Sequence, residues 1–505
     1  MRRLSAAPRP ALALLLALLP PLVALIAWRQ VVHGYFYSDD FQTLYDLANG
    51  TLVRALFEPA FGHVNTTRNA VMGLFYWAFG PRAEVIYGAV LAVHALNAFL
   101  LYRVASRLSG DRLVAAAVAI VWAISPLHRG TLDWCAAHGH AWIATLALLM
   151  LDRLATFELD ERRLGRGEAA LWGLALIAMA TSYGIGMGIA FSFPVVALVI
   201  AGRRLRPASV AVLGAALLLF AVTYVALKAH YPPPAAPFGH LAAPTLSDML
   251  AHPVELLVLV LHLPGVCAAA LALGPLLREH AYPGWPDVVA WGAVACVLVA
   301  ALRRGEQTRW LLGLLLLAFG CYPLIALGRI VVNPESPIGL ALTPRYHYAP
   351  QVALALALAL ALAMFRTVHP RLVGMGVAAW VALLLVGLVA HPLQPDPHAF
   401  ERHASARVVA QVRAAVRTLP RGETVYIPNE AFPPILFLTN FQGPWKFPGL
   451  AGAFVIFFPG DAVEGRRVRF VASDPEQLTA AALTGGRIAA LLVPAAPPPP
   501  AAPPP

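Results

Sequence analysis

Apolar runs of about 20 residues, long enough for a helix to cross the ~30 Å hydrocarbon core of a bilayer, recur along most of this chain with clusters of arginine between them. Only 12% of the 505 residues are charged, about half the share of roughly 25% in soluble proteins. Such a chain could not cover a soluble surface. We therefore predict an all-α polytopic membrane protein with about 11 to 13 transmembrane helices. Eleven crossings are assigned, at 10–32, 84–104, 112–127, 138–154, 168–183, 185–201, 208–228, 287–302, 309–331, 350–366 and 371–391.

The arginine clusters predict which side of the membrane each loop occupies, because cytoplasmic loops carry an excess of Lys and Arg. The predicted cytoplasmic side also holds the N-terminus, which leads into an uncleaved first helix. A composition rich in Ala and Arg and poor in Lys is typical of a bacterial protein, so the membrane is predicted to be the inner (plasma) membrane and the opposite side the periplasm. The clusters lie on one side of the eleven crossings, at 2–9, 103–112, 153–166, 203–206, 303–309 and 366–371.

Two apolar stretches need separate interpretation. A full crossing at 253–277 would move the arginines at 303–309 to the periplasmic side, and Leu263-Pro264-Gly265 interrupts the stretch. Because proline breaks helix interiors, we expect an interfacial or re-entrant helix pair there. The alternating Leu and Ala of 352–363 imitate a strand. An open strand cannot satisfy its backbone in lipid, so this stretch is predicted to be helical.

The chain is expected to divide into a transmembrane domain, residues 1–391, and a periplasmic α/β domain, residues 392–493. An odd number of crossings leaves the C-terminal part in the periplasm, and its composition is more polar. Residues 494–505, rich in proline and alanine, are predicted to be a disordered tail. Within the α/β domain we expect helices at 399–418 and 475–484 and extended segments at 424–427, 454–458 and 468–471.

The first periplasmic loop, residues 33–83, is far longer than a connection between helices requires, and loops of this length usually carry function. Asp39 and Asp40 are adjacent near its start. Two adjacent carboxylates repel, so the pKa of at least one should rise unless a cation or hydrogen-bond donors hold both ionised. They are candidate catalytic acids. The alternative is a solvated pair that caps a helix over about 41–56.

Arginines near the periplasmic surface are candidates for binding an anion. His63 and Arg68 lie in the first loop, where a cation beside the bilayer can bind a phosphate or a lipid headgroup. Arg345 and Tyr346 precede a late crossing. The arginine there can clamp an anionic headgroup or extend its side chain to the interface.

The second periplasmic loop contains His128 and Asp133, followed by His138 and His140. Histidines suggest a metal, but neither H-E-x-x-H nor a close carboxylate appears, so no metal ligand is assigned. We interpret His128 and Asp133 as polar contacts to a substrate. No cofactor is implied with certainty, and a divalent metal remains open.

Several classes of protein are excluded. The net charge is +11, but the cations lie in short clusters and not on one face, so nucleic acid is not an expected partner. Neither lysine lies in a P-loop motif, and the four cysteines form no C-x-x-C pair. The glycine run at 184–188 follows no strand, so close helix packing is expected there and not nucleotide binding.

The layout of residues 10–390 resembles the GT-C glycosyltransferases, polytopic enzymes that use polyprenyl-phosphate-linked sugars and include the protein O-mannosyltransferases and the lipid A aminoarabinose transferases. The R-Y-x-Y-x-P motif of one branch is matched in full by 345–350. The H-x-x-x-x-R-P and N-x-x-x-H motifs are matched in part, because Asn69 follows Arg68 and His94 precedes Asn97. The resemblance rests on Asp39-Asp40, the long first loop, His94-Ala95-Leu96-Asn97, Pro126-Leu127-His128 and Arg345-Tyr346-His347-Tyr348-Ala349-Pro350.

The resemblance implies roles for individual residues. Asp39 or Asp40 would be the general base for an acceptor hydroxyl or amine that attacks the anomeric carbon. The polyprenyl phosphate would leave, with its charge stabilised by Arg345. His63 and Arg68 match weaker substrate-binding positions. The implied partners are the lipid-phosphate sugar donor, an extracytoplasmic acceptor (lipid, glycan or protein) and membrane lipid.

Two alternatives remain. In a flippase or transporter the same acids and arginines would line a translocation path. Intramembrane charges are sparse, however, and only one helix break is found where two matching breaks would be expected. The other alternative is a non-catalytic relative that has kept the fold.

Overall fold

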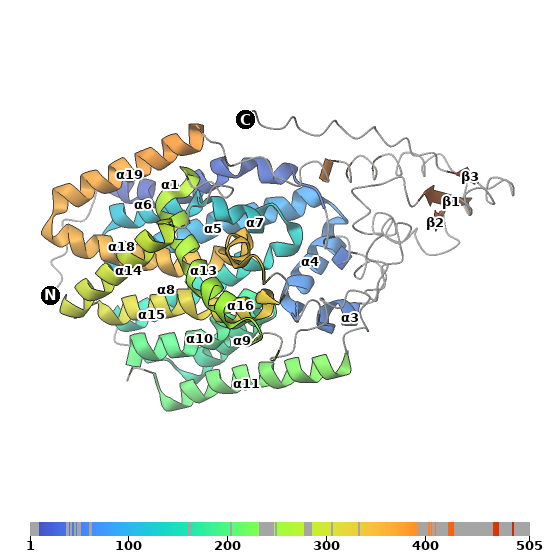
Figure 1. The fold of residues 1–505 in the computed structure, drawn as a ribbon, viewed down its shortest axis with the longest axis horizontal. Coiled ribbons are helices and arrows are strands. Elements are labelled where there is room, and N and C mark those ends of the chain that lie inside the picture. Colours follow the sequence, from blue (N-terminus) through green and yellow to red (C-terminus); the bar gives the residue numbers. More distant parts are fainter. Residues whose placement is uncertain are drawn as a thin grey trace. The chain divides into compact units, whose positions relative to one another are not determined.

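The apolar runs of the sequence form long helices (Figure 1). The structure, a computed structural model, describes residues 10–36, 52–59, 63–159, 163–202, 205–231, 250–276, 285–304, 307–331 and 334–390, together with ten further positions and three strands. Contacts divide the chain into two units. The first unit comprises Met1–Gly34, Val53–Phe75 and Arg82–Asp396, and the second comprises Tyr35–Leu52, Tyr76–Pro81 and Pro397–Pro505.

The first unit is a bundle of long helices. Nine helical segments among the described residues are apolar and long enough to cross a membrane, and a pair of helices bent by 51° could form a tenth span. The predicted multi-pass helical membrane protein is therefore confirmed. One of the nine segments joins α15 and α16, and the bundle also contains α6, α9 and α14. Together the helices of the bundle are α1 (Pro10–Ala27), α5 (Ala83–Ser109), α6 (Arg112–Ala123), α8 (Gly139–Leu159), α9 (Arg166–Ala180), α10 (Gly184–Ala201), α11 (Pro207–His230), α13 (Pro253–Leu273), α14 (Trp285–Arg304), α15 (Thr308–Gly320), α16 (Tyr322–Ile330), α18 (Tyr348–Val368) and α19 (Pro370–Ala390).

Short helices connect these spans. The longest, α4, continues into residues of the second unit. Those that matter for the site are α3 (Leu52–Phe57), α4 (Thr66–Phe79), α7 (Arg129–Leu132), α17 (Pro337–Ala341) and the 3₁₀ helices η1 (Arg29–His33), η2 (Pro126–His128), η3 (Cys135–Ala137), η6 (Gly274–Leu276) and η8 (Pro344–Tyr346).

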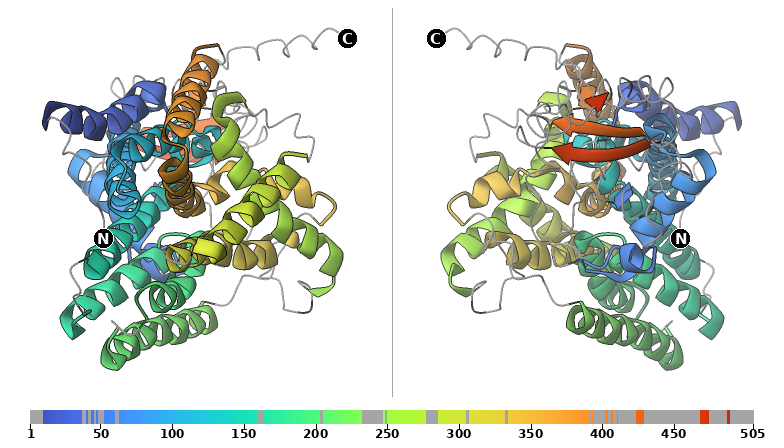
Figure 2. Two further views of the ribbon diagram at one scale, coloured as in Figure 1. Left: turned by 90° about the vertical axis from the view of Figure 1, so that its left-hand side faces the viewer. Right: turned by 90° about the vertical axis from the view of Figure 1, so that its right-hand side faces the viewer.

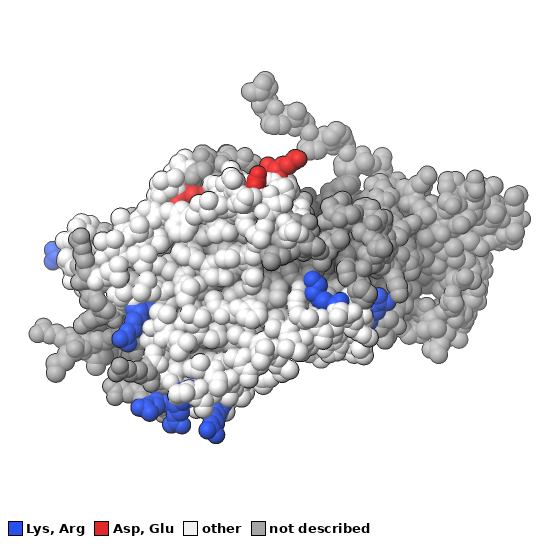
Figure 3. Space-filling view, turned by 60° about the horizontal axis from the view of Figure 1, so that its bottom comes forward, with Lys and Arg blue, Asp and Glu red and all other residues white. Residues whose placement is uncertain are grey.

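Small side chains let the central helices pack closely. The Leu-Ala alternation of 352–363 lies within α18, which confirms the predicted helix, and most of its residues are buried. The outer helix α11 instead exposes apolar side chains, with Leu218 and Val225 about two-thirds exposed (65% and 66%). Figure 3 shows a broad uncharged surface with the charged side chains gathered toward its margins. Such a surface suits lipid and not water.

The predicted break at 253–277 is wrong. Helix α13 runs without interruption through Pro264, which removes one backbone donor while the surrounding residues stay packed. Leu263 and Gly265 are buried, and a Cβ added to Gly265 would lie 2.6 Å from the Asp287 carboxylate. Close packing against the start of α14 thus compensates for the proline. In Figure 1 α13 runs steeply across the view, whereas α11, α15 and α18 lie closer to horizontal.

Two other predicted crossings, 168–183 and 287–302, fall on helices that are not among the nine long apolar segments, although α14 itself has 20 residues and contains all of 287–302. The crossing at 168–183 corresponds to α9, which has 15 residues. The crossing at 287–302 corresponds to α14, whose apolar part is Trp285–Val299.

Three strands are described in the second unit. They are β1 (Glu423–Pro428), β2 (Val468–Ser473) and β3 (Arg487–Ile488), which pair in parallel in the order β2-β1-β3 (Figure 2). The extended segments predicted at 424–427 and 468–471 lie within β1 and β2. The segment 454–458, the helix at 475–484 and the tail at 494–505 lie outside the described residues, as does most of the helix at 399–418.

Candidate functional site

Cationic side chains from four separate elements act electrostatically on one histidine in the first unit. Arg68 lies in the first turn of α4, Arg329 in the last turn of α16 and Arg345 in η8, and all three act electrostatically on His63, which precedes α4. Lys228, in the last turn of α11, acts on it as well. We call His63, Arg68, Arg329 and Arg345 the cationic cluster. Residues from the first loop and from the end of the chain's helical part thus meet at one site.

His63 is held as a neutral side chain. Burial, followed by the positive charges of the neighbouring arginines and Lys228, lowers its pKa to about 3. The imidazole lies against Gly184 and 5.6 Å from the ring of Tyr183. Its Nδ1 is buried and has no hydrogen-bond partner among the described residues. A neutral ring with an unused nitrogen can accept or donate one hydrogen bond to a ligand.

Hydrogen bonds hold Arg68 in place. Its Nε donates to Oδ1 of Asn69 (2.8 Å), whose amide in turn donates to the carbonyl of Ala55. The backbone N–H of Thr67 donates to the carbonyl of Thr181 (3.0 Å), which ties α4 to the end of α9. Asn69 stands where the H-x-x-x-x-R-P motif has proline. Asn69 donates its backbone N–H to Asn65 (2.8 Å), a bond that proline could not make.

Aromatic rings hold the two late arginines. The guanidinium of Arg345 lies 5.1 Å from the ring centroid of Trp134 and 5.2 Å from that of Tyr346. Arg329 approaches the same tyrosine ring at 5.9 Å. Helix η8 is fixed against α7, because a Cβ added to Gly130 would lie 2.6 Å from the backbone nitrogen of Arg345. Stacking orients a guanidinium, and its fork of N–H groups suits a phosphate.

Two further histidines lie close to the cluster. Nδ1 of His138 contacts the carbonyl of Cys135 (2.6 Å), whereas its Nε2 and both nitrogens of His140 are buried without partners among the described residues. His140 stacks on Tyr183 at 4.3 Å, and Arg68, Arg345 and His63 act on it electrostatically. A buried polar group left without a hydrogen bond costs about 1–3 kcal/mol. Water or a polar ligand would satisfy these nitrogens.

The described residues contain no group of three or more His, Cys, Asp or Glu side chains that could hold a metal ion. The histidines of the site are accompanied by arginines, whose charge repels a cation. The residues therefore fit an anion better than a metal.

His128 and Asp133, which the sequence analysis interprets as substrate contacts, make contacts with other residues of the protein in the structure. His128 is fully buried, with its ring 4.5 Å from those of Trp122 and Tyr348. Asp133 forms an ion pair with Arg129 (3.9 Å), and its carbonyl accepts a hydrogen bond from Tyr87 (3.1 Å). Both residues thus support η2 and α7, against which η8 packs.

Two sequence motifs meet in one buried network behind η8. His94 contacts the hydroxyl of Tyr348 (2.8 Å), and Asn97 donates to the same oxygen (3.3 Å). Thr145 donates to Oδ1 of Asn97 (2.7 Å). His347 contacts the carbonyl of Ala341 (2.7 Å). These bonds join α5, α8 and α18 and fix the backbone that carries Arg345.

The predicted catalytic acids belong to the second unit. Asp40 is helical and buried. Asp39 lies outside the described residues.

The sequence prediction missed Arg329, which ends the apolar helix α16. Its position resembles that of any cation at a membrane surface, so no local pattern distinguishes it. The glycine run, in contrast, packs as expected. A Cβ added to Gly186 would lie 1.8 Å from the carbonyl oxygen of Met179, and a Cβ added to Gly188 would lie 2.5 Å from Cα of Cys321.

Gly184→Ala should disturb the cluster. The added Cβ would lie 2.4 Å from Cε1 of His63, whereas Gly214→Ala, our matched control in α11, meets nothing within 4 Å. Overpacking costs typically about 1–3 kcal/mol, so we expect Gly184→Ala to lower the melting temperature in detergent and to weaken phosphate binding. Gly214→Ala should do neither. Native-like phosphate binding in Gly184→Ala would show that His63 does not shape the site.

Because of His63, the free energy of unfolding should decrease as the pH is lowered. Its pKa of about 3 in the fold lies below the ordinary value of 6.5, so the unfolded chain binds the proton first. The stability due to neutral His63 is present above about pH 6.5 and is lost as the pH falls toward 3. Thermal unfolding between pH 4 and 7 should therefore show a shallower pH dependence for His63→Gln than for the native chain. Equal slopes would contradict the assigned environment.

The comparisons with known proteins assign no family. No protein-family model matches the chain, and no curated protein matches it. The function must therefore be argued from the residues of the site.

Proposed function

We propose that this protein is an integral membrane glycosyltransferase that moves a sugar from a polyprenyl-phosphate donor to an extracytoplasmic acceptor. The observation that carries the proposal is the cationic cluster with its neutral, partly unbonded His63. Arginines oriented by aromatic rings are suited to a phosphate, and the long apolar helices keep the site at a lipid surface. A phosphate attached to a lipid satisfies both requirements.

The cluster would act on the leaving group. When the bond between the anomeric carbon and the phosphate oxygen breaks, negative charge grows on that oxygen. Arg345, Arg329 and Arg68 would stabilise this charge in a largely buried site, where such interactions are strong. His63 or His140 can donate a further hydrogen bond from a neutral ring. No nucleotide site is needed, because the phosphate reaches the membrane already bonded to the sugar.

The acceptor must lose a proton as it attacks. We assign this step to Asp39 or Asp40, which takes the proton from the acceptor hydroxyl or amine while the new bond to the anomeric carbon forms. The assignment is supported by the adjacency of the two acids and by the resemblance to the GT-C glycosyltransferases.

We further propose an N-terminus in the cytoplasm and a periplasmic α/β domain at 392–493 that selects the acceptor. The arginine clusters before α13, at 2–9, 103–112, 153–166 and 203–206, support the orientation of the N-terminus, and the parallel pairing of β1 with β2 and β3 supports an α/β domain. Deletion of 393–505 should reduce acceptor use and leave donor binding intact. Loss of both would contradict the proposed role.

The direct test is conversion of the donor. Membranes with the protein, and matched membranes without it, are supplied with a pool of labelled polyprenyl-phosphate sugars. A transferase should release free polyprenyl phosphate and move the label to an acceptor. If the donor only changes leaflet and stays intact, the protein is a flippase. If the donor binds but neither moves nor reacts, the protein is a non-catalytic relative.

A further inference from the structure

Two arginines of α5 share one buried carboxylate of α8. Nη2 of Arg103 donates to Oδ2 of Asp152 (2.8 Å), and Nη1 of Arg107 donates to Oδ1 of the same residue (2.6 Å). Arg107 also donates to the hydroxyl of Thr156 (2.8 Å). Asp152 is buried, whereas the side chains of Arg103 and Arg107 are 45% and 33% exposed. We call Arg103, Asp152 and Arg107 the double ion pair.

The double ion pair carries an excess of positive charge. A buried carboxylate needs a partner, because leaving it unpaired is strongly destabilising. One arginine supplies that partner, and the second leaves one net positive charge at a partly exposed position. Among the described residues, Arg103 contacts Asp152 through a single nitrogen. The other N–H groups of its guanidinium can therefore bind an anion.

The double ion pair lies far from the cationic cluster. Asp152 follows His140 by about 12 residues of α8, which at 1.5 Å per residue is roughly 18 Å. Helix α5 begins near the loop that carries Asp133, because Tyr87 donates to the carbonyl of that residue (3.1 Å), and it reaches Arg103 only in its second half. An anion held at the double ion pair is thus separate from the phosphate of the proposed donor.

Apolar side chains lead to the arginines along both helices. On α5, Leu96 is 44% exposed and Phe99 is half-buried, and their spacing puts both on the face of Arg103. On α8, Leu149 is 44% exposed, and the exposed Arg153 follows it one turn later. Each face therefore changes from apolar to cationic toward the end of its helix. A membrane leaflet changes from acyl chain to headgroup in the same order.

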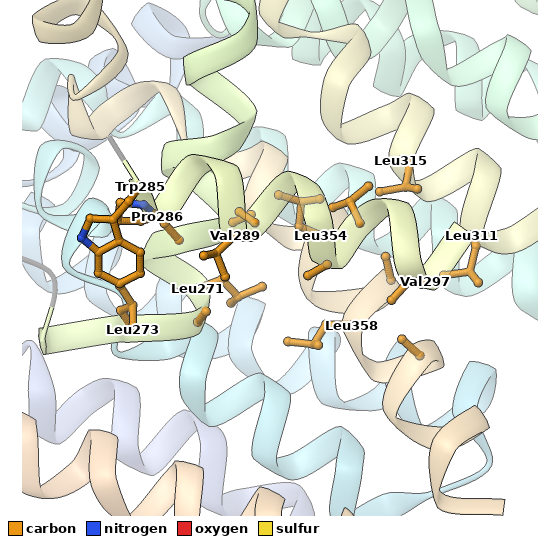
Figure 4. Close-up of a pocket in the computed structure, with 18 residues that line it drawn as sticks. Leu271, Leu273, Trp285, Pro286, Val289, Val297, Leu311, Leu315, Leu354 and Leu358 are labelled. Carbon is orange, nitrogen blue, oxygen red and sulfur yellow. The ribbon is translucent and has the colours of Figure 1, made fainter. Parts of the chain in front are cut away.

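Apolar surface alone does not choose among lipids, because all acyl chains are similarly apolar. The groove between α13, α14, α15 and α18 has this character, since none of its described wall residues is charged (Figure 4). The exposed faces of α5 and α8 differ because they end in arginines, whose N–H groups suit a phosphodiester. Basic sites between helices at a membrane surface bind anionic headgroups.

We propose that the double ion pair binds the phosphodiester of an anionic glycerophospholipid whose acyl chains lie along the exposed faces of α5 and α8. The ligand is a lipid of the surrounding bilayer, and the site does not depend on the proposed sugar transfer. The protein should therefore bind phosphatidylglycerol more tightly than phosphatidylcholine with the same acyl chains. In phosphatidylcholine the choline cation cancels the charge of the phosphate.

Removal of the excess charge tests the site. In Arg103→Gln, Arg107 still neutralises Asp152, so we expect the variant to fold with a melting temperature close to that of the native chain. Arg153→Gln is the matched control, because Arg153 is an exposed arginine of α8 that pairs one to one with Glu168 (3.0 Å). The purified full chain is titrated with each phospholipid, and native mass spectrometry counts the lipids bound.

We expect Arg103→Gln to weaken phosphatidylglycerol binding about fivefold, the factor that corresponds to ~1 kcal/mol per arginine beside an anionic membrane surface. Binding of phosphatidylcholine should not change. Arg153→Gln should bind both lipids like the native chain.

Photocrosslinking tests the location on the native chain, without a substitution. A phosphatidylglycerol with a photoreactive group close to its headgroup should label peptides of α5 and α8, and excess unlabelled phosphatidylglycerol should prevent this. Equal labelling by the matching photoreactive phosphatidylcholine would overturn the inference.

Three results of the titration would also overturn it. Equal affinity of the native chain for the two phospholipids would show that the site does not select an anionic headgroup. Equal losses in Arg103→Gln and Arg153→Gln would show attraction by total surface charge and not by the double ion pair. Native binding of phosphatidylglycerol by Arg103→Gln would leave the two arginines only the role of joining α5 to α8.

Discussion

Replacing the proposed catalytic base by asparagine should lower the proposed sugar transfer by about 10²- to 10⁴-fold, the usual contribution of general base catalysis. Asparagine keeps the size of Asp39 or Asp40 but cannot accept the acceptor's proton. We expect this loss in one of the two variants, Asp39→Asn or Asp40→Asn, and a smaller loss in the other. The measurement is the rate of transfer in membranes that contain equal amounts of each protein.

A control from the same loop separates catalysis from a general effect of charge. Glu58 forms an ion pair with Arg54 one helical turn away, so Glu58→Gln should transfer sugar at nearly the native rate. Binding of polyprenyl phosphate should persist in both Asp variants, because neither acid belongs to the cationic cluster. The acidic limb of the pH–rate profile should disappear with the base. Native transfer by both variants would refute the assignment of the base.

The sequence predicts the helices well because their signal is local. An apolar run must be helical in lipid whatever surrounds it, and α18 is helical despite its strand-like alternation. The break predicted at Pro264 is wrong because the contact that stabilises the helix there is not local. The cost of the proline is local, but the compensating contact between Gly265 and Asp287 comes from another helix. No pattern within 253–277 indicates that Gly265 packs against Asp287.

The site was predicted in separate parts. His63, Arg68 and Arg345 are visible in the sequence as polar residues beside apolar runs, but their meeting depends on the packing of α4, η8 and α16. Arg329 was missed because its place in the cationic cluster depends on His63 and Tyr346, which lie far from it in the sequence. The sequence likewise does not show that His94 and Asn97 both contact the hydroxyl of Tyr348.

Arg345→Ala should lower the rate of transfer about 10²- to 10³-fold, as expected when one group that stabilises developing charge is removed. Arg345→Lys should restore only part of the activity. Lysine keeps the charge but lacks the flat guanidinium that lies over Trp134 and Tyr346. The control is Arg153→Ala, because Arg153 pairs with Glu168 (3.0 Å) outside the cluster and should leave transfer unchanged.

The chemistry of the leaving group shows whether Arg345 acts in the transition state or only in binding. A donor whose phosphate is a better leaving group develops less charge that needs stabilisation, so it should suffer less from Arg345→Ala than the natural type of donor. Equal losses in kcat/KM with both donors, accompanied by weaker binding of polyprenyl phosphate, would assign Arg345 to ground-state binding alone. A native kcat with both donors would remove Arg345 from the mechanism and leave Arg68 and Arg329 as the groups that face the phosphate.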